Sequence, residues 1–375
     1  MNLILSIAIA ITLASAALIL VRYSRLRLTG SDPLPLATFM AILFTSGLDV
    51  GLIMFPLTEF PIYESEPAYG FTNALAIEFG FWGFLVWGFY FLTTFYFCVV
   101  EPRLKLFEIG WIKLLNNAVI IATCAFTGFL FLTYLPTYVE GISDSLRYAL
   151  VALVVLLAVL SSTDIRYIKW LSLGSCALFF GLMAVLWLAS GAGIAGLVDS
   201  ASNIGGYFPN IHRFATPITD HHAFYLFWWF AWSIMIGQFV ARFVGGITTA
   251  QLVVALLVIP SIPIALWFAL LFYIHSNGIA LSGTLQMGMV VVGVIFVINS
   301  LDSLTRLYSE NLGLTVTRFG IKHYTLAHWV LLYGLILLYQ FTPLKIEWIG
   351  LVVIGIYAAI YTLTFTRRAE LRQPA

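Results

Sequence analysis

Long apolar runs recur along this 375-residue chain and constrain its fold more than any other feature. A helix crosses the hydrocarbon core of a membrane in about 20 apolar residues, and it satisfies its own backbone hydrogen bonds there. Candidate runs lie near 2–22, 36–60, 74–99, 115–136, 147–162, 169–193, 222–246, 250–274, 279–304, 323–342 and 346–366. Only 9% of the residues are charged, against about 25% in soluble domains. The sequence therefore predicts an all-α polytopic membrane protein with about eleven transmembrane helices.

Loop charges predict how these helices are oriented. If the loop after the first run is cytoplasmic, only Arg147, Arg213 and Lys345 of the 18 lysine and arginine residues fall outside. Positive charge accumulates on the cytoplasmic side of membrane proteins. We therefore expect a multi-pass protein of the cell inner (plasma) membrane, with its N-terminus outside and its C-terminus in the cytoplasm. The first run lacks a basic segment before it and exceeds a signal-peptide core of roughly 7–15 residues, so we expect it to be retained.

Several function classes lack support in the sequence. The loops contain no HExxH, GxxxxGK[ST] or GxSxG motif, so we expect neither an enzyme nor an ATP-driven pump. The net charge of +1 and the lack of a basic run argue against nucleic-acid binding. The three cysteines lie singly in apolar runs, and His221 and His222 follow Asp220 at the start of a run. We expect the histidines to be polar helix ends, and we expect no metal or organic cofactor.

The second run carries an acid between two glycines. Gly47 and Gly51 flank Asp49, and Pro56 follows. Discontinuous helices of this kind form the substrate and ion sites of secondary transporters. The alternative is a glycine packing notch, which is common between membrane helices. An acid inside the membrane is costly without a partner or a role, so the pattern favours a site that includes Gly47, Asp49 and Gly51.

Two aromatic clusters lie in the middle of apolar runs, whereas aromatic residues of membrane proteins normally gather at the interface. The clusters are Trp82, Trp87 and Tyr90, and Trp228, Trp229 and Trp232. Ring faces attract quaternary ammonium groups, which have no N–H to donate. At about 100° per residue, the first three rings share one broad face of a continuous helix. The alternative is that all six rings are ordinary packing residues.

Two further acids lie inside apolar runs. Glu78 is one turn before Trp82, near the outer end of the third run, and we expect it to reach the interface. Asp302 lies near the cytoplasmic end of its run, where it either pairs with Arg306 at i+4 or contributes to ion binding.

Four segments, in order along the chain, resemble the betaine/choline/carnitine transporter (BCCT) family over roughly residues 20–310. They are 44–55 with Glu59, the Trp82-(x)4-Trp87-(x)2-Tyr90 spacing, 224–233 continuing to 248, and 299–303. The resemblance implies a LeuT-like fold of two inverted five-helix repeats with one extra N-terminal helix. The single transporter domain would comprise the extra helix 1–30, a first repeat 36–193, an external loop with an interfacial helix 194–221, a second repeat 222–366 and a short cytoplasmic tail 367–375. Family members generally have two preceding helices, so the chain resembles a compact member.

The resemblance also implies a function. It predicts a secondary active transporter of a small quaternary-ammonium osmolyte of the choline, glycine betaine or carnitine type, working by alternating access. Trp82, Trp87, Tyr90 and Trp229 would form the substrate's aromatic box, and Trp228 and Trp232 would line the same pathway. Backbone groups near Gly47 to Gly51 would meet the other end of the substrate. The expected partners are this small molecule and the lipid bilayer, and the family implies a homotrimer.

Two departures from the family pattern concern coupling. Asp49 stands where betaine-selective relatives have glycine, and Asn299 and Ser300 stand where sodium-coupled relatives have two adjacent hydroxyl residues. Asparagine still offers a carbonyl oxygen, so sodium remains open, but we prefer proton coupling through Asp49. Two other functions are compatible with the sequence: transport of another small solute, such as a sulfonium compound or an amino acid, and a non-transporting membrane sensor with a BCCT-like site.

Overall fold

The computed structural model describes residues 1–46 and 50–372. Over these residues, ten helical segments are long and apolar enough to cross a membrane. They are α1 (Asn2–Tyr23), α5 with α6 (Ala74–Trp82, Trp87–Val99), α8 (Gly110–Tyr138), α9 (Asp144–Ser161), α10 (Ile165–Ser190), α12 (Asp220–Ala241), α13 with α14 (Thr249–Val253, Ser261–Ser276), α15 (Gly283–Leu312), α16 (Val316–Phe341) and α17 (Ile346–Thr366). The prediction of an all-α polytopic membrane protein is confirmed.

The second apolar run is present in pieces. It forms α2 (Leu36–Ser46), α3 (Val50–Met54) and α4 (Pro56–Ser65). None of these three helices is long enough to cross a membrane by itself, so the described residues contain ten candidate spans against the eleven expected. Gly47 and Asp49, which the sequence places in the site, lie outside the described residues.

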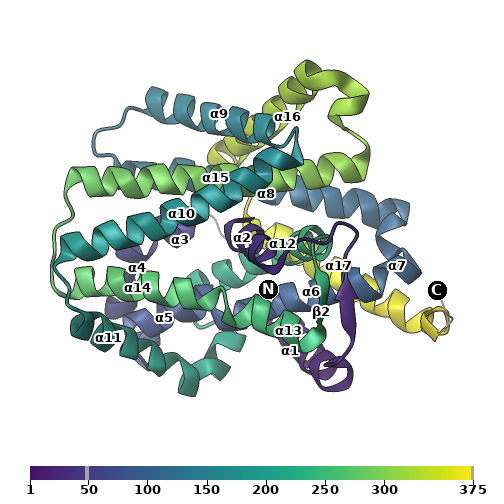
Figure 1. The fold of residues 1–375 in the computed structure, drawn as a ribbon, viewed down its shortest axis with the longest axis horizontal. Helices are drawn as coiled ribbons and strands as arrows, with labels where there is room; N and C mark the ends of the chain where they lie inside the picture. Colours follow the sequence, from purple (N-terminus) through teal and green to yellow (C-terminus); the bar gives the residue numbers. More distant parts are fainter. Residues whose placement is uncertain (47–49, 373–375) are drawn as a thin grey trace.

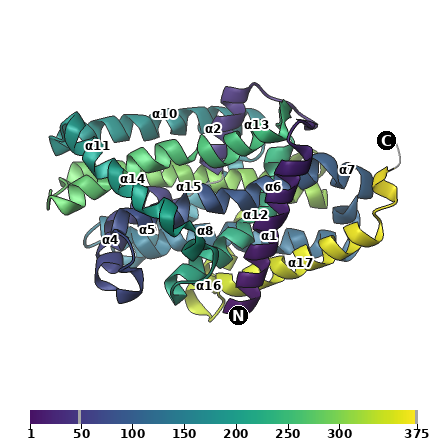
Figure 2. The same cartoon turned by 90° about the horizontal axis from the view of Figure 1, so that it is seen from below.

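The helices form a bundle around α12. In Figure 1, α2 and α12 lie near the middle of the projection, and α15 runs beside α10. Helix α12 packs against α6, α8 and α17, while α15 packs against α8, α9 and α10. Figure 2 shows α1 lying across one side of the molecule, where it contacts α6 and α17. A short antiparallel pair, β1 (Arg27–Thr29) and β2 (Gly245–Thr248), ties the segment after α1 to the segment after α12.

The third apolar run is interrupted between two of the predicted site residues. Helix α5 ends at Trp82, Gly83 is extended (φ −106°, ψ 168°), and a short 3-10 turn, η2 (Phe84–Val86), precedes Trp87. Phe84 adopts a left-handed backbone (φ 47°), which costs energy for a residue with a side chain. The continuous helix assumed for placing Trp82, Trp87 and Tyr90 on one face is therefore wrong, because the chain turns within that spacing.

A second interruption meets the first. Between α13 and α14 the chain forms a π-helical turn, η5 (Val254–Val258), followed by Pro260. The Ser261 hydroxyl oxygen at the start of α14 accepts a hydrogen bond from the Phe84 N–H at 2.8 Å. This contact satisfies a backbone donor freed by the first break.

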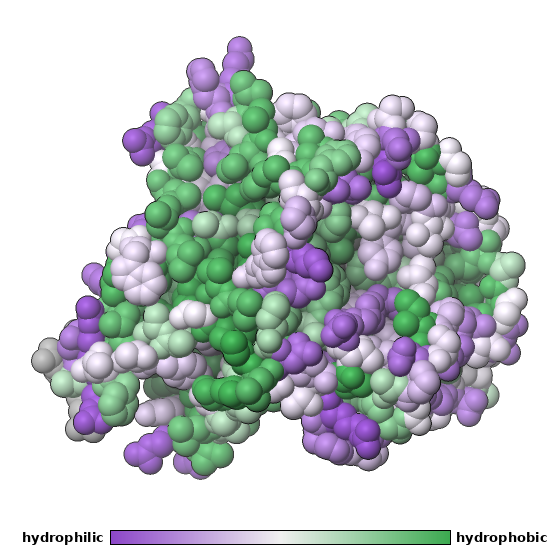
Figure 3. Space-filling model, turned by 180° about the vertical axis from the view of Figure 1, so that it is seen from behind, coloured by the Kyte–Doolittle hydropathy of each residue, from purple (hydrophilic) through white to green (hydrophobic). Residues whose placement is uncertain are grey.

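The segment between α10 and α12, where an interfacial helix was expected, forms two short helices, α11 (Ile194–Ser202) and η4 (Asn203–Ala215). The outer surface is strongly apolar. Leu3, Val21 and Leu188 are each more than 70% exposed, and Figure 3 shows a broad area of apolar side chains on one face. A surface of this kind requires lipid as its solvent.

Candidate functional site

Five of the six predicted aromatic residues form one continuous group of rings at the junction of α5, α6 and α12. We call Trp82, Trp87, Tyr90, Trp228 and Trp229 the aromatic cluster; none is more than 2% exposed. The Trp82 ring lies perpendicular to those of Trp229 and Trp228, with centroids 5.3 and 5.6 Å apart. The Trp228 and Trp229 rings stack with their centroids 5.6 Å apart. The Tyr90 ring lies between two others, with its centroid 5.2 Å from that of Trp87 and 6.2 Å from that of Trp229.

Trp232, the sixth residue, is buried at 2% exposure but takes no part in the ring contacts that join the other five across the described residues. It lies one turn beyond Trp228 on α12. The rings of α5 and α6 therefore meet those of Trp228 and Trp229, whereas the Trp232 ring is not among these contacts.

The break in the third run holds the cluster together. The Trp229 indole N–H donates to the Phe81 carbonyl at 2.7 Å, and the Trp87 indole N–H donates to the Trp82 carbonyl at 3.0 Å. Both carbonyls lie in the last turn of α5, where the following break removes their helical donors. The indoles therefore supply hydrogen bonds to the broken helix as well as ring faces to the site.

Gly51 of α3 lies against this cluster. A Cβ atom at Gly51 would lie 2.4 Å from the Trp82 ring, closer than any real contact permits. The glycine predicted to shape the broken second run is therefore required for the close approach of α3 to Trp82. Phe55, which follows on the same segment, places its ring 6.1 Å from Trp82 and 6.3 Å from Trp228.

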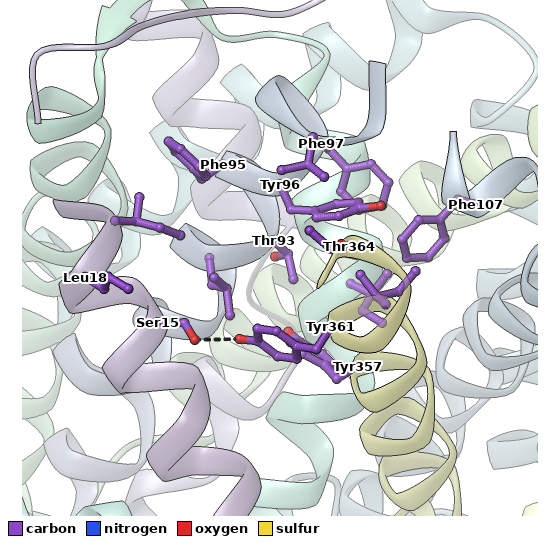
Figure 4. Close-up of a pocket in the computed structure, with 15 residues that line it drawn as sticks. Ser15, Leu18, Thr93, Phe95, Tyr96, Phe97, Phe107, Tyr357, Tyr361 and Thr364 are labelled. Carbon is purple, nitrogen blue, oxygen red and sulfur yellow. Dashed lines mark hydrogen bonds between the residues drawn. The ribbon is translucent and has the colours of Figure 1, made fainter. Parts of the chain in front are cut away.

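The cluster is closed in this conformation. A pocket of about 290 Å³ opens between α1, α6 and α17, where Ser15 and Tyr361 are hydrogen-bonded at 2.8 Å (Figure 4). Another, of about 400 Å³, opens between α2, α10 and residues 259–263. Neither is lined by a residue of the aromatic cluster. Neither of these two pockets therefore gives a substrate direct access to the rings.

A group of polar residues, not predicted from the sequence, lies beside the aromatic cluster. We call Glu59, Tyr63, Glu78 and Tyr225 the acidic cluster. Glu59 is 1% and Glu78 is 0% exposed. The Glu59 carboxylate accepts hydrogen bonds from the Tyr63 hydroxyl at 2.6 Å and the Tyr225 hydroxyl at 2.7 Å. The expectation that Glu78 reaches the interface is wrong, because α4, η4 and α12 cover this part of α5.

The two histidines beside this group have separate environments. His221 Nε2 lies 3.4 Å from Glu59 and its side chain is 30% exposed. His222 is buried, stacks on Phe81 at 4.4 Å and accepts a hydrogen bond from the Ile218 N–H at 3.1 Å. A signal for the acidic cluster existed in the sequence, since Glu59 and Glu78 both lie in apolar runs, but nothing local indicated that they meet.

Asn299, one of the two predicted coupling residues of α15, faces α10. The Asn299 amide donates to the Ser175 hydroxyl at 2.7 Å, and its oxygen accepts a longer bond from Ser172 at 3.5 Å. Asn299 and Ser300 are both fully buried. Their position relative to Asp49 is not defined, since Asp49 lies outside the described residues.

Asp302 has different partners from those expected. Its carboxylate accepts hydrogen bonds from the Ser161 hydroxyl of α9 at 2.5 Å and from Ser303 at 3.1 Å. Arg306 instead pairs with Glu310 at 2.8 Å. The predicted i+4 pair is therefore wrong, because a hydroxyl from another helix reaches Asp302 and a second acid, one turn further on, takes the arginine.

The C-terminal half of α12 is bordered by amides and paired charges. We call Asn116, Asn117, Gln238 and Asn311 the amide cluster. Asn311 donates to Asn117 at 3.1 Å, Asn116 donates to Gln238 at 3.2 Å, and Gln238 donates to Asn311 at 3.4 Å. Arg242 pairs with Glu310 at 2.5 Å, so that Glu310 joins the ends of α12 and α15. These contacts connect α8, α12 and α15.

Comparison with a solved structure identifies the class of fold. The chain is similar to a Na+-coupled sialic acid symporter in its substrate-bound, outward-open state, with a TM-score of 0.51, 15% identity, and coverage of 94% of this chain and 85% of that one. At this identity the likeness shows the fold alone, which is the LeuT-like arrangement of a polytopic membrane protein.

Sequence comparisons show similarity to one family of transporters. The family model described as BCCT, betaine/carnitine/choline family transporter, matches residues 119–281. An uncharacterized transporter of Mycobacterium tuberculosis is 24% identical over 66% of this chain and 50% of its own length. The glycine betaine transporter OpuD of Bacillus subtilis is 24% identical over 63% of this chain and 54% of its own length. The chain is therefore similar to transporters of the betaine/carnitine/choline family over part of its length, and it spans about half the length of these relatives.

Proposed function

We propose that this chain is a secondary active transporter that moves a small quaternary-ammonium osmolyte, of the choline, glycine betaine or carnitine type, by alternating access. Similarity to the betaine/carnitine/choline transporter family supports the transport class and the candidate solutes. The observation that carries the proposal for this chain is the aromatic cluster, in which rings from α5, α6 and α12 converge far from any lipid surface. Rings in this position have no interfacial role to explain them.

The cluster suits the chemistry of an onium group. A quaternary ammonium cation offers no N–H, so ring faces are the main attraction that a protein can provide. Each ring face contributes about 0.5–2 kcal/mol, depending on how fully water is excluded. Three or four faces at the buried cluster would contribute several kcal/mol. A sulfonium compound presents the same charge and shape to the rings and is an alternative solute, as is an amino acid.

Binding requires a conformational change. The closest ring centroids within the cluster are 5.2 Å apart, and the described conformation is therefore a closed one. The broken backbone at Gly83 and the second break near Pro260 are the places where α5 and α14 would turn, because neither carries a continuous helical hydrogen-bond ladder. In the proposed transport cycle, two repeats, 36–193 and 222–366, move relative to each other around this site.

We place the N-terminus outside and the C-terminus in the cytoplasm, and we regard the protein as a homotrimer. In this orientation the acidic cluster lies on the outer side of the rings and the amide cluster on the inner side. For coupling, we favour protons over sodium. The Asn299 amide, at the position of one sodium-site hydroxyl in relatives, is engaged by Ser172 and Ser175 of α10. Asp49 would be one proton carrier.

Uptake into proteoliposomes tests the proposal. Purified protein is reconstituted, and accumulation of radiolabelled choline, glycine betaine and carnitine is measured under an imposed proton or sodium gradient. Accumulation of at least one solute under the proton gradient is expected, together with loss of uptake in Trp229→Leu but not in the matched variant Trp170→Leu, whose ring is 80% exposed. Specific binding without flux would instead identify a membrane sensor, and no binding of any of the three would refute the proposal.

A further inference from the structure

Two carboxyl groups beside the aromatic cluster are buried without a lysine or arginine partner among the described residues. Glu59 of α4 and Glu78 of α5 are 1% and 0% exposed. In the part of the chain that the structure describes, no lysine or arginine forms an ion pair with either of them. A buried charge without a counterion is costly at any depth in a membrane protein, and such acids usually mark ion or proton pathways.

The two carboxyl groups are not equivalent. Glu59 accepts hydrogen bonds from the hydroxyls of Tyr63 and Tyr225, and His221 Nε2 lies 3.4 Å away. These donors stabilise an ionised carboxylate. No hydrogen bond of ordinary geometry reaches either oxygen of Glu78 within the described residues, although Glu59, Tyr63 and Trp82 lie close enough to interact with it. Both Glu78 oxygens are thus buried without a hydrogen-bond partner among the described residues, and the Glu59 carboxylate is one of the groups that interact with them.

Among the described residues, His221 is the one basic side chain beside the pair, and it lies against Glu59. The other titratable groups that face the pair are phenols: Tyr63 of α4, Tyr69 of η1 (Pro67–Tyr69), Tyr134 and Tyr138 of α8, and Tyr225 of α12. The remaining basic groups nearby are engaged elsewhere. His275 of α14 pairs with Glu64 at 3.2 Å, Arg213 of η4 lies over the Phe71 ring at 4.6 Å, and His212 is exposed.

We propose that Glu59 and Glu78 form a proton-binding pair that holds one proton, on Glu78, while the aromatic cluster is closed, and releases it when a cationic solute enters the cluster. Two neighbouring carboxylates cannot both be ionised in a buried site without a counterion. A proton is the cation that fits, because neither described pocket is lined by the pair and a hydrated or multiply coordinated ion needs space. This inference rests on the proposed function, since it links the pair to onium binding.

Two side chains connect the pair to the rings. Trp82 lies one turn after Glu78 on α5, and its ring contacts Tyr225 at 5.7 Å and Trp229 at 5.3 Å. Tyr225 donates its hydroxyl to Glu59 while its ring lies 5.7 Å from Trp228. Opening the cluster must therefore move residues that touch both carboxyl groups. An onium charge placed there supplies the missing counterion, so the proton is displaced to solvent.

Proton release on binding tests this inference. Choline binding to the purified full-length protein is measured by calorimetry in buffers of different ionisation enthalpy, and its affinity is measured as a function of pH. The wild type is expected to release about one proton, and its affinity should rise by as much as about tenfold per pH unit where the pair titrates. Glu78→Gln should bind choline without proton release and with an affinity that changes less than about twofold over the same range.

Glu64→Gln is the matched control, because Glu64 lies on the same helix as Glu59 but is half exposed and paired with His275. It should release the same number of protons as the wild type. Equal proton release in the wild type and in Glu78→Gln would overturn the inference, and so would loss of release in both glutamate variants.

A second measurement does not depend on any solute. Infrared difference spectra of the choline-free wild type should contain a protonated-carboxyl C=O band that is lost in Glu78→Gln and insensitive to sodium. Absence of this band, or its removal by sodium at constant pH, would contradict a proton at this position. If no quaternary ammonium solute binds, the proposed function fails while the infrared experiment still decides whether the pair holds a proton.

Discussion

The two halves of α12 are surrounded by polar residues of opposite character. Along its N-terminal half, Tyr225 reaches a buried acid whose neighbour Glu78 has no counterion. Along its C-terminal half, Gln238 and Arg242 join an array in which amides pair with amides and Glu310 pairs with two arginines. The aromatic cluster lies between them. Buried polar groups thus have two roles in this protein. Groups that pair with one another hold helices together, and a group without a pair is free to change its protonation.

The largest loss of stability is expected when the ion pairs of Glu310 in the C-terminal half are broken. Glu310→Leu leaves Arg242 and Arg306 without their shared carboxylate. Removing one partner of a buried ion pair costs about 3–5 kcal/mol, and an exposed pair contributes less than about 1 kcal/mol. The Glu310 and Arg242 side chains are 31% and 25% exposed, so an intermediate loss of about 2 kcal/mol is expected in detergent unfolding experiments.

Glu108→Leu serves as its control, because Glu108 pairs with Lys113 at 2.8 Å with a side chain that is 64% exposed. Its expected loss is below about 1 kcal/mol. Equal losses in the two variants would show that the C-terminal half of α12 is no more dependent on its ion pairs than the surface is.

The next effect concerns the rings between the two halves. Trp229→Phe keeps an aromatic face but removes the N–H that binds the Phe81 carbonyl at 2.7 Å. A buried carbonyl left without its donor costs about 1–3 kcal/mol. Choline affinity is therefore expected to fall about tenfold, measured by tryptophan fluorescence or uptake, while Trp170→Phe leaves it unchanged. Unaltered affinity in Trp229→Phe would mean that the hydrogen bond does not position the ring.

A small gain in the free energy of unfolding is expected when a polar group of the N-terminal half is replaced. Glu78→Leu removes a buried carboxyl group that has no hydrogen bond to lose among the described residues. Replacing unpaired buried polarity by an apolar side chain is neutral or stabilising. Unfolding at neutral pH should show a gain of up to about 1 kcal/mol. A loss as large as that of Glu310→Leu would remove the distinction between the two halves of α12.

The smallest effect concerns a carboxylate in the loop between α9 and α10. Hydrogen bonds from Arg166 lower the pKa of Asp164 to about 2. A lowered pKa stabilises the folded protein above the unfolded value of about 3.9, and this stabilisation is lost as the pH falls toward 2. Asp164→Asn should therefore show the same pH dependence of stability as the wild type between about pH 5 and 8 and differ from it only below about pH 4. A difference near neutral pH would assign part of that dependence to loop carboxylates.

Some of these features follow from the sequence and others do not. The helix wheel placed Trp82 and Trp87 on one continuous face, but the chain breaks at Gly83. The Phe81 carbonyl freed by that break accepts a hydrogen bond from the Trp229 indole N–H, and the freed Phe84 N–H donates to Ser261; both partners are far along the chain. The break is stable because of these distant partners, and no local pattern contains them.

The acids show the same division. Both Glu78 and Asp302 were recognised as intramembrane acids, yet both assignments of their surroundings were wrong. Glu78 is covered by α4, η4 and α12, and Asp302 is hydrogen-bonded by Ser161, 141 residues earlier. The expected Arg306 was a sound local candidate, but Glu310 is also one turn away and takes it.

The sequence by itself determined that the chain is polytopic, where its long apolar segments lie and which residues carry ring faces and charge. These properties are sums over neighbouring residues, because transfer of a helix into lipid depends on its own side chains. The tertiary structure alone decided which polar atoms are paired, where the helices break and which rings meet. Hydrogen bonds and burial depend on groups that are distant along the chain, and only packing brings these groups together.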